Sequence, residues 1–212
     1  MDKLDPREKI LLGSEELFHQ HGVKNLSMDE IARHLGVSKK TIYIYFKDKQ
    51  DLLTACVRNH FLARETAMKS LHQQNLPAIE EYFYLMEEVS NSIREHTSSL
   101  LMIQEIKRYY PEVWGIFREF KQKCILNSVE NNLRNGINEG VYRPEIDVAI
   151  IARIRGAEME AISNPEIFPH YEFHLPHLFD QLLMYHLYGI CTPKGAKKLI
   201  SLLNKKHKIE NP

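Results

Sequence analysis

Two helix starts follow each other closely near the beginning of this chain, and they constrain its fold more than any other feature. Ser27 and Glu30 have the spacing of a capping box, in which a hydroxyl and a carboxylate satisfy free amides at a helix start. Gly36 then favours the end of that helix, and Ser38 is a suitable N-cap for the next one. Two short helices joined by a turn of about three residues form a helix-turn-helix.

The remainder of the chain also favours helices. Glycines and prolines, 9 of each, stand mostly where helices would end, and no segment alternates with the two-residue period of a strand. We therefore predict an all-α fold, with a small N-terminal module, a long connecting helix and a larger helical domain. Besides the two short helices, the predicted helices cover residues 6–20, 48–72, 77–95, 98–108, 111–139, 147–163, 175–191 and 194–205.

Composition bounds the class of protein. Hydrophobic residues make up 43% of the chain and charged residues 26%, values typical of a globular protein with a buried core. The chain has no apolar run of membrane-spanning length and no apolar signal segment at its start, so we expect a cytoplasmic protein. The three cysteines, Cys56, Cys124 and Cys191, are far apart, which favours reduced, buried thiols over disulfides or a zinc site.

Net charge is zero, with 28 basic and 28 acidic residues, so only local charge can indicate nucleic-acid binding. Residues 33–49 contain one acid, Asp48, and five basic residues, namely Arg33, Lys39, Lys40, Lys47 and Lys49. Ile42 and Phe46 share one buried face of the second short helix. Lys39, Lys40, Tyr43 and Ile44 are then free to meet base edges, and Tyr45 to meet phosphate. The alternative is a solvated basic face with partly buried tyrosines.

The complete motif is more specific than the patch. The chain reads Leu17-Phe18, Gly22, Ser27-Met28-Asp29-Glu30-Ile31-Ala32, Gly36-Val37-Ser38-Lys39, Thr41-Ile42-Tyr43, Tyr45-Phe46, Lys49 and Leu52-Leu53. Over residues 10–53 this pattern resembles the N-terminal signature of the TetR family of bacterial transcriptional regulators. Lys40 departs from the pattern, because many members carry a small residue there.

The resemblance implies a fold, partners and DNA contacts. It implies a three-helix DNA-binding module in residues 1–48, a connecting helix in 49–74 and a helical ligand-sensing and dimerisation domain in 75–212. The DNA-binding residues that we predict are Ser27, Ser38, Lys39, Lys40, Thr41, Tyr43, Tyr45 and Lys49. Among them, the resemblance implies phosphate contacts from Ser27, Thr41, Tyr45 and Lys49, and base or groove contacts from Lys39, Lys40 and Tyr43.

Two later helices favour self-association. The predicted dimer interface is formed by apolar residues on these two helices, namely Ile150, Ile154, Ala157, Leu178, Leu182 and Tyr185. Gly156 would permit close helix approach, and the second helix carries another apolar stripe with Phe179, Leu183 and Ile190. The alternative is that both stripes belong to the core of a single chain.

Aromatic residues and methionines are frequent between residues 82 and 120. A predicted ligand pocket is lined by Phe83, Met86, Met102, Tyr109, Trp114, Phe117 and Phe120, although such residues also form ordinary cores. Nothing in the sequence names the ligand.

Other candidate sites are interpreted as structural. His170, His174 and His177 lie near Glu172 in a proline-bounded segment that favours a loop over a metal site. We expect a solvated helix face at the four glutamates Glu80, Glu81, Glu87 and Glu88. Residues 194–208 contain six lysines, and we expect them to form a frayed basic terminus, although this segment could instead contact DNA.

The sequence contains no nucleophile elbow, phosphate loop or His-Glu-x-x-His motif, so we expect neither an enzyme nor a cofactor or metal. We predict a homodimeric repressor that binds a palindromic double-stranded DNA operator and is released by a small-molecule effector, with no membrane partner. Alternatives are an activator or broad architectural DNA binder, and a small-molecule-binding protein or enzyme that keeps this fold.

Overall fold

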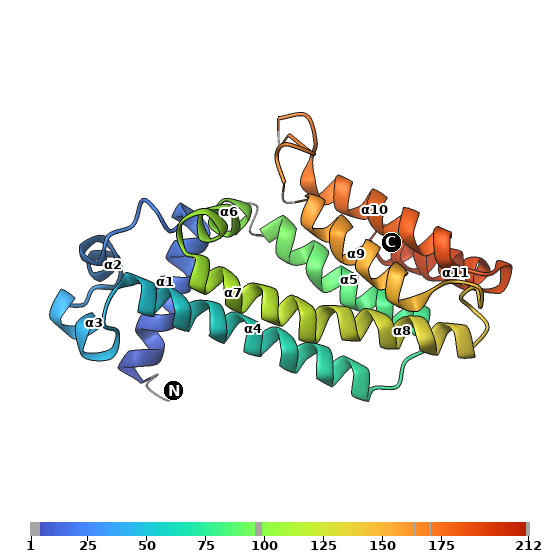
Figure 1. Ribbon diagram of the computed structural model, residues 1–212, viewed down its shortest axis with the longest axis horizontal. Coiled ribbons are helices and arrows are strands. Elements are labelled where there is room, and N and C mark those ends of the chain that lie inside the picture. Colours follow the sequence, from blue (N-terminus) through green and yellow to red (C-terminus); the bar gives the residue numbers. More distant parts are fainter. Residues whose placement is uncertain (1–4, 96–98, 163, 170, 211–212) are drawn as a thin grey trace. The chain divides into compact units, whose positions relative to one another are not determined.

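The computed structural model describes residues 5–95, 99–162, 164–169 and 171–210, and it confirms the all-α prediction (Figure 1). Within these residues the one strand-like pairing is an isolated bridge between Tyr142 and Cys191. No helix in this part of the chain has the length and apolar character needed to cross a membrane. The helices are α1 (Pro6–His21), α2 (Met28–Leu35), α3 (Lys39–Tyr45), α4 (Lys49–Gln73), α5 (Ala78–Glu95), α6 (Ser99–Tyr109), α7 (Pro111–Phe120), α8 (Leu126–Asn138), α9 (Val148–Ile162), α10 (Leu175–Ile190) and α11 (Pro193–Glu210).

The helices form two compact units that do not follow the order of the chain. The first unit contains residues up to 65 and residues 96–120, and the second contains residues 66–95 and 121–212. Helices α6 and α7 therefore pack with the N-terminal helices, whereas the sequence places them in a separate domain after residue 75. Helix α4 contributes to both units.

The first unit has a core formed by α1 to α4 and closed by α6 and α7. Pro6 opens α1, and Ile10, Leu11, Leu17 and Phe18 are buried, as their helical spacing predicts. The capping box of α2 is also confirmed, because the Ser27 hydroxyl accepts from the Glu30 amide at 3.2 Å and the Glu30 carboxylate accepts from the Ser27 amide at 2.7 Å.

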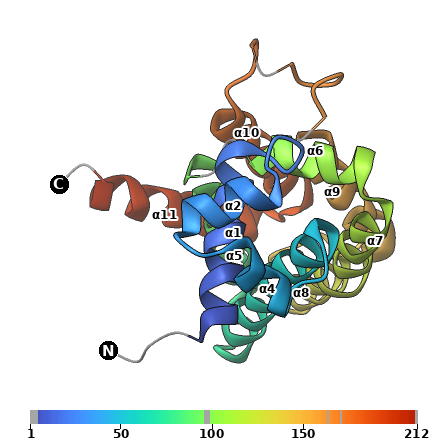
Figure 2. The ribbon, with the colours of Figure 1, turned by 90° about the vertical axis from the view of Figure 1, so that its left-hand side faces the viewer.

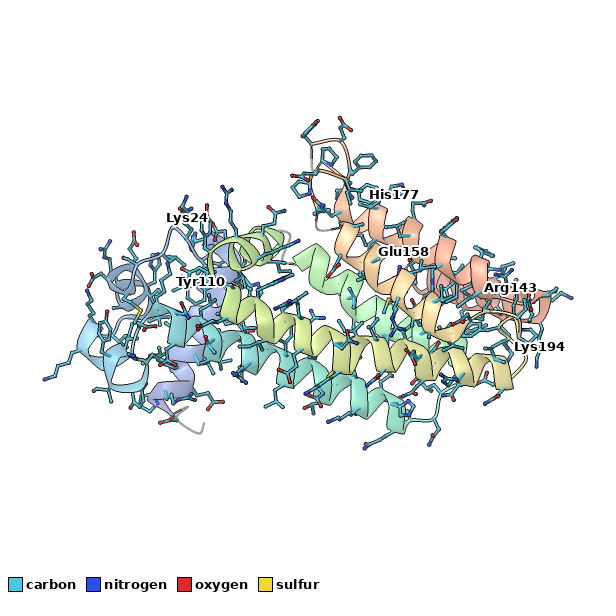
Figure 3. The ribbon with its side chains drawn as sticks, viewed as in Figure 1. Lys24, Tyr110, Arg143, Glu158, His177 and Lys194 are labelled. Carbon is cyan, nitrogen blue, oxygen red and sulfur yellow. The ribbon has the colours of Figure 1, made fainter. Side chains whose placement is uncertain are left out.

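A buried carboxylate joins α6 to the connection between α1 and α2. Glu105 accepts hydrogen bonds from the backbone amides of Val23, at 2.5 Å, and Lys24, at 2.9 Å. Gly22 has a φ of 75°, and a Cβ at this position would lie 2.8 Å from a Glu105 carboxylate oxygen. Figure 3 labels Lys24, whose ammonium lies 5.4 Å from the centre of the Tyr109 ring on α6.

The predicted helix over residues 111–139 is interrupted by a π turn. Helix α7 ends at Phe120, residues Lys121–Ile125 adopt π-helical hydrogen bonding, and α8 begins at Leu126. A π turn inserts an extra residue into the helical repeat and so rotates the faces on either side of it. The boundary between the two units falls at the same point, and Val113 is buried in the first unit whereas Leu133 is buried in the second.

The second unit is built from α5, α8, α9, α10 and α11, with a core that includes a polar network. Glu81 accepts from the Asn132 amide at 2.7 Å and is hydrogen-bonded to His72 at 2.9 Å, and the Tyr142 hydroxyl donates to the Asn132 side-chain oxygen at 3.2 Å. The expectation that Glu81 lies on a solvated face is wrong, because these partners on α8 and α4 compensate for its burial.

The basic C-terminal segment begins with an ordered contact. Lys194, labelled with Arg143 in Figure 3, donates from its ammonium to the Glu139 carbonyl oxygen at 2.7 Å, and the Arg143 amide donates to the Ile190 carbonyl at 2.9 Å. Helix α11 continues to Glu210, beyond the predicted end at 205. The side chains of Lys205, Lys206 and Lys208 lie outside the described residues.

Glu105→Gln is expected to destabilise the first unit. An amide retains one carbonyl oxygen, whereas the buried carboxylate oxygen of Glu105 now accepts two backbone N–H groups with the strength of a charged acceptor. We expect a loss of about 1–3 kcal/mol in the free energy of unfolding, measured by urea denaturation. Glu145→Gln, at an exposed ion pair, is the matched control and should be neutral. Equal stability of the two variants would contradict the structural role of Glu105.

Candidate nucleic-acid interface

Helix α3 presents one face to the core and the opposite face to solvent. Ile42 and Phe46 have exposed fractions of 0% and 2%, so they anchor the helix against the first unit, as the sequence predicts. Tyr43 and Ile44 are 45% and 68% exposed. Their exposure within the first unit leaves this side of α3 open to a large partner such as a DNA groove, next to α2, which is labelled in Figure 2.

The start of α3 is held by its own hydroxyl groups. The Ser38 hydroxyl accepts from the Thr41 amide at 3.0 Å, and its oxygen lies 2.7 Å from the Thr41 hydroxyl oxygen. These contacts fix the N-terminal turn, which places Lys39 and Lys40 on exposed positions. A phosphate contact from Thr41 therefore has to share a hydroxyl that already caps the helix.

Sequence analysis did not identify the partner of Lys39. Its ammonium lies 2.7 Å from an Asp29 carboxylate oxygen at the start of α2, and both side chains are largely exposed. The hydrogen bond with Asp29 raises the pKa of Lys39, so this lysine is charged at neutral pH. The Asp29 carboxylate lies in the first turn of α2, where a negative charge stabilises the helix N-terminus. The local positive charge at the exposed face is accordingly smaller than the lysine count indicates.

The start of α4 adds a second cationic position. Asp48 accepts from the Asp51 amide at 2.8 Å, which confirms the predicted cap, and Asp51 accepts from the Lys47 amide at 2.9 Å. Lys49 follows as the first residue of the helix. Burial lowers the pKa of Lys49, while Glu105 and Glu30 oppose this effect. Its half-buried position holds the ammonium near the helix start, where backbone amides also favour anions.

The eight predicted DNA-binding residues differ in accessibility. Ser27, Ser38, Lys39, Lys40 and Tyr43 are exposed, and Thr41, Tyr45 and Lys49 are partly buried. The ring of Tyr45 packs against the hydrophobic core of the first unit. The alternative of partly buried tyrosines therefore holds for Tyr45 but not for Tyr43. Ser27 has its hydroxyl oxygen 2.7 Å from the Glu30 carboxylate, so it is already engaged within the capping box.

The residues predicted for dimerisation lie mostly on an open face of the second unit. Ile150, Ile154, Ala157 and Tyr185 are exposed, Leu182 is partly buried, and Leu178 is buried within its own chain. The other stripe of α10, with Phe179, Leu183 and Ile190, is buried in the core. The stripes thus divide into one inner face and one outer face.

The residues predicted for a ligand pocket belong to different units. Phe83 and Met86 are in the second unit, and the other five are in the first: Met102, Tyr109, Trp114, Phe117 and Phe120. Met102 and Trp114 pack against the core of the first unit, and the Phe120 ring stacks on Phe61 at 4.4 Å between centroids. Tyr109 is exposed. Packing within the first unit, which is the alternative that the sequence left open, therefore accounts for Met102, Trp114 and Phe120.

Two of the histidines that the sequence singles out are exposed, whereas two other histidines lie close to a glutamate. His174 and His177 are exposed, and His170 lies outside the described residues. In the first unit, ligand atoms of Glu15, His19 and His60 lie within 4.8 Å of one another. Burial is the largest influence and raises the pKa of Glu15, but the hydrogen bonds from His60, at 3.0 Å, and Asn59 together with the charges of the two histidines outweigh it, so the pKa lies below its ordinary value.

Known proteins resemble this chain both in its N-terminal segment and in its fold. Residues 10–56 match the family described as bacterial regulatory proteins, tetR family. The HTH-type transcriptional regulator SAB2452 of Staphylococcus aureus is 26% identical over 153 residues, which cover 62% of this chain and 82% of that protein. Other regulators match over only 51 to 53 residues, and the chain spans 22% to 28% of their length.

Two solved structures show the same arrangement of helices. The first is SmeT of Stenotrophomonas maltophilia, the repressor of a multidrug efflux pump, with a TM-score of 0.70, 20% identity and coverage of 90% of this chain and 92% of that one. The second is a regulator from Saccharomonospora viridis in complex with choline, with a TM-score of 0.75, 20% identity and coverage of 88% and 97%. At this identity the likeness concerns the fold.

An exposed recognition helix on a helix-turn-helix, with a larger helical unit behind it in the sequence, defines a DNA-binding transcriptional regulator. The match over residues 10–56 falls on the segment that forms this module. Residues 10–56 of this chain carry the DNA-binding module of the TetR family of bacterial transcriptional regulators. The relatives that share this module are described as HTH-type transcriptional regulators.

Asp29→Asn is expected to strengthen binding to DNA. The substitution removes an acid from the face that is predicted to meet phosphate and releases Lys39 from its ion pair. We expect an affinity gain of about two- to fivefold and a plot of log affinity against log salt that is steeper by about one unit, since one more cation is free to displace counterions. Fluorescence anisotropy over a salt series measures both quantities. Glu145→Gln, which breaks an exposed ion pair in the second unit, should leave DNA affinity unchanged. Weaker binding by Asp29→Asn would show that Asp29 positions Lys39 for DNA.

Proposed function

We propose that the chain acts as a homodimeric repressor that binds a palindromic operator and releases it when a small-molecule effector binds. The observation that carries this proposal is the exposed face of α3, a helix that its buried side chains hold in place. This face presents Lys39, Lys40, Tyr43 and Ile44 to solvent. A regulator of this class acts where the chromosome lies, which supports the predicted cytoplasmic location.

The DNA contacts follow from the chemistry of the exposed groups. Lys39 and Lys40 can donate to guanine acceptors, and the apolar Ile44 suits a thymine methyl group. The Tyr43 hydroxyl and the Lys49 ammonium suit phosphate oxygens, which set the position of the protein on the duplex. Because a helix of seven residues offers few base contacts, one copy reads a short half-site.

Dimerisation is supported by the open apolar face of α9 and α10. Ile154 is 47% exposed and Tyr185 is 76% exposed, and both are large residues that a second copy would shield from water. A two-fold dimer presents two copies of α3 to successive major grooves and thereby matches a palindrome. SmeT, which has the same fold, is itself described as a repressor.

Effector release requires that ligand and operator favour different states. The coupling between two such sites is reciprocal and typically amounts to about 1–3 kcal/mol. Helix α4 can carry it, because it begins at Lys49 beside the recognition helix and ends at Gln73 within the second unit. The regulator from Saccharomonospora viridis, which shares this fold, was solved in complex with choline, and this supports a ligand-binding role for the fold.

Tyr43→Ala and Lys49→Ala are expected to weaken operator binding while the dimer persists. The operator is first obtained by selecting bound duplexes from a random pool, and a palindrome with half-sites about 10 base pairs apart is expected. Tyr43→Ala should lower affinity about tenfold, and Lys49→Ala should reduce the salt slope by about one. Affinities and salt slopes are measured by fluorescence anisotropy. Tyr171→Ala, at a tyrosine that is 87% exposed in the second unit, is the control. Selection of no sequence, or unchanged binding by both variants, would sink the proposal.

Ile154→Glu is expected to convert the dimer into monomers. The side chain is exposed in the single chain, so the fold tolerates the charge, but two-fold symmetry would bury two carboxylates in the interface. We expect the dimer dissociation constant to rise at least about a hundredfold, measured by analytical ultracentrifugation. Ile200→Glu, at a residue with a similar exposed fraction of 46% on α11, is the matched control. A dimer of unchanged strength in Ile154→Glu would exclude this face as the interface.

A further inference from the structure

A charged side chain is buried in the core of the second unit. Arg155, on α9, is 1% exposed. One guanidinium nitrogen, Nη1, donates to Glu158, one helical turn later, at 3.2 Å, and Nη2 lies 3.3 Å from the Met86 sulfur on α5. The guanidinium carbon also lies 5.9 Å from the centre of the Phe179 ring on α10. Three helices of one unit therefore surround this cation, and Figure 3 labels Glu158 on α9.

The surroundings of Arg155 contain an unusual concentration of unpaired polar atoms. Four buried side-chain nitrogen or oxygen atoms have no hydrogen-bond partner within the described part of the chain, and three of them belong to Tyr82, Arg155 and His186. The rings of Tyr82 and His186 stack with centroids 5.5 Å apart. Buried polar groups normally have partners, so three unpaired ones in one cluster suggest that a ligand supplies them.

The two neutral members of the cluster are held in a form suited to an anion. Burial raises the pKa of Tyr82, although the nearby Arg155 guanidinium opposes this effect, so the phenol keeps its proton. Burial, together with the charge of Arg155, lowers the pKa of His186 to about 3, so its ring is neutral at physiological pH. The Tyr82 hydroxyl can donate a hydrogen bond, and the neutral His186 can donate from Nε2 in one of its two tautomers.

The free edge of Arg155 indicates the chemistry of the ligand. Its Nε and Nη2 hydrogens point in the same direction, which is the geometry that a planar carboxylate accepts with both oxygens. Nε has no hydrogen-bond partner, Nη2 donates to the weakly accepting sulfur of Met86, and the guanidinium also interacts with the nearby Tyr82 hydroxyl. Glu158 already offsets part of the positive charge, so a single negative charge fits this site better than the two charges of a phosphate monoester. Met86 and Phe179 favour an apolar remainder.

We propose that Arg155, Tyr82 and His186 form the recognition site for the carboxylate of a small, otherwise apolar monocarboxylic acid, which is the effector. Arg155 binds both carboxylate oxygens through Nε and Nη2, and Tyr82 and His186 each donate one further hydrogen bond. This inference rests on the proposed function, because an effector-released repressor needs a ligand site in its helical domain. Because Arg155 is deeply buried, the surrounding helices must move apart when the acid enters. This movement would distinguish the effector-bound state from the operator-bound state.

The test is isothermal titration calorimetry on the full-length protein with benzoate and octanoate. Each acid is compared with its neutral amide, benzamide or octanamide. We expect at least one acid to bind, and its amide to bind at least about tenfold more weakly because the charged hydrogen bonds are lost. Arg155→Met should abolish binding of the acid, and Tyr82→Phe should weaken it about tenfold. Arg153→Met, at an exposed arginine two residues earlier on α9, is the matched control and should bind normally.

Two variants are used because one of them can fail to fold. Arg155→Met removes one partner of a buried ion pair, which can destabilise a fold, although the partly exposed Glu158 can turn toward water. Tyr82→Phe removes a hydroxyl that has no partner, so it should preserve the fold and keeps the test decisive even if Arg155→Met does not fold. Failure of both acids to bind the wild-type protein, equal binding of acid and amide, or unchanged binding by Tyr82→Phe would overturn the proposal.

Operator binding distinguishes this inference from the proposed function. If the protein selects a palindrome but binds neither acid, the repressor proposal stands and the carboxylate site is wrong. If an acid binds through Arg155 without lowering operator affinity, the site stands as a binding site and the effector role is wrong. If no operator is selected, the proposed function fails whatever the acids do.

Discussion

Burial of Ile42 and Phe46 is the interaction on which the DNA-reading face depends. Helix α3 has seven residues and is too short to be stable alone in water, so its conformation comes from packing against the first unit. The two anchored side chains leave Tyr43 and Ile44 facing outward by the geometry of the helix. The Ser38 cap then sets where the helix begins and hence where Lys39 and Lys40 project. A rigid core and an adaptable exposed surface are combined within one short segment.

The buried polar groups of this protein differ in how completely their hydrogen bonds are satisfied. Glu105 and Glu81 are buried, and each accepts hydrogen bonds that join distant parts of the chain, so they stabilise the fold. Arg155 differs, because its own charge is only partly matched and its neighbours Tyr82 and His186 carry unpaired atoms. A fully satisfied network makes a unit rigid, whereas an incompletely satisfied one leaves free energy that a ligand can recover. The location of such a site in the second unit agrees with the division of labour in a ligand-responsive regulator.

Local signals in the sequence predicted the helices well because each depends on neighbouring residues. The capping box at Ser27, the cap at Asp48 and the apolar spacing of α1 all appear in the structure as expected. The π turn after Phe120 was not predicted, because the apolar pattern is compatible with a continuous helix over 111–139. Its position is decided by packing, since the helix supplies side chains to one core before the turn and to another after it. The burial of Glu81 was missed for a similar reason, because its partners lie on other helices.

The sequence by itself determined that the chain is helical, where its helix-turn-helix lies and which family this module resembles, since these follow from local spacing and a contiguous motif. Only the tertiary structure decided that α6 and α7 pack with the N-terminal unit, that Lys39 pairs with Asp29, and which stripe of α10 is buried. It also brought Tyr82, Arg155 and His186 together from three separate helices. Contacts between residues far apart in the chain depend on how whole helix faces fit one another, and no short segment of sequence contains that information.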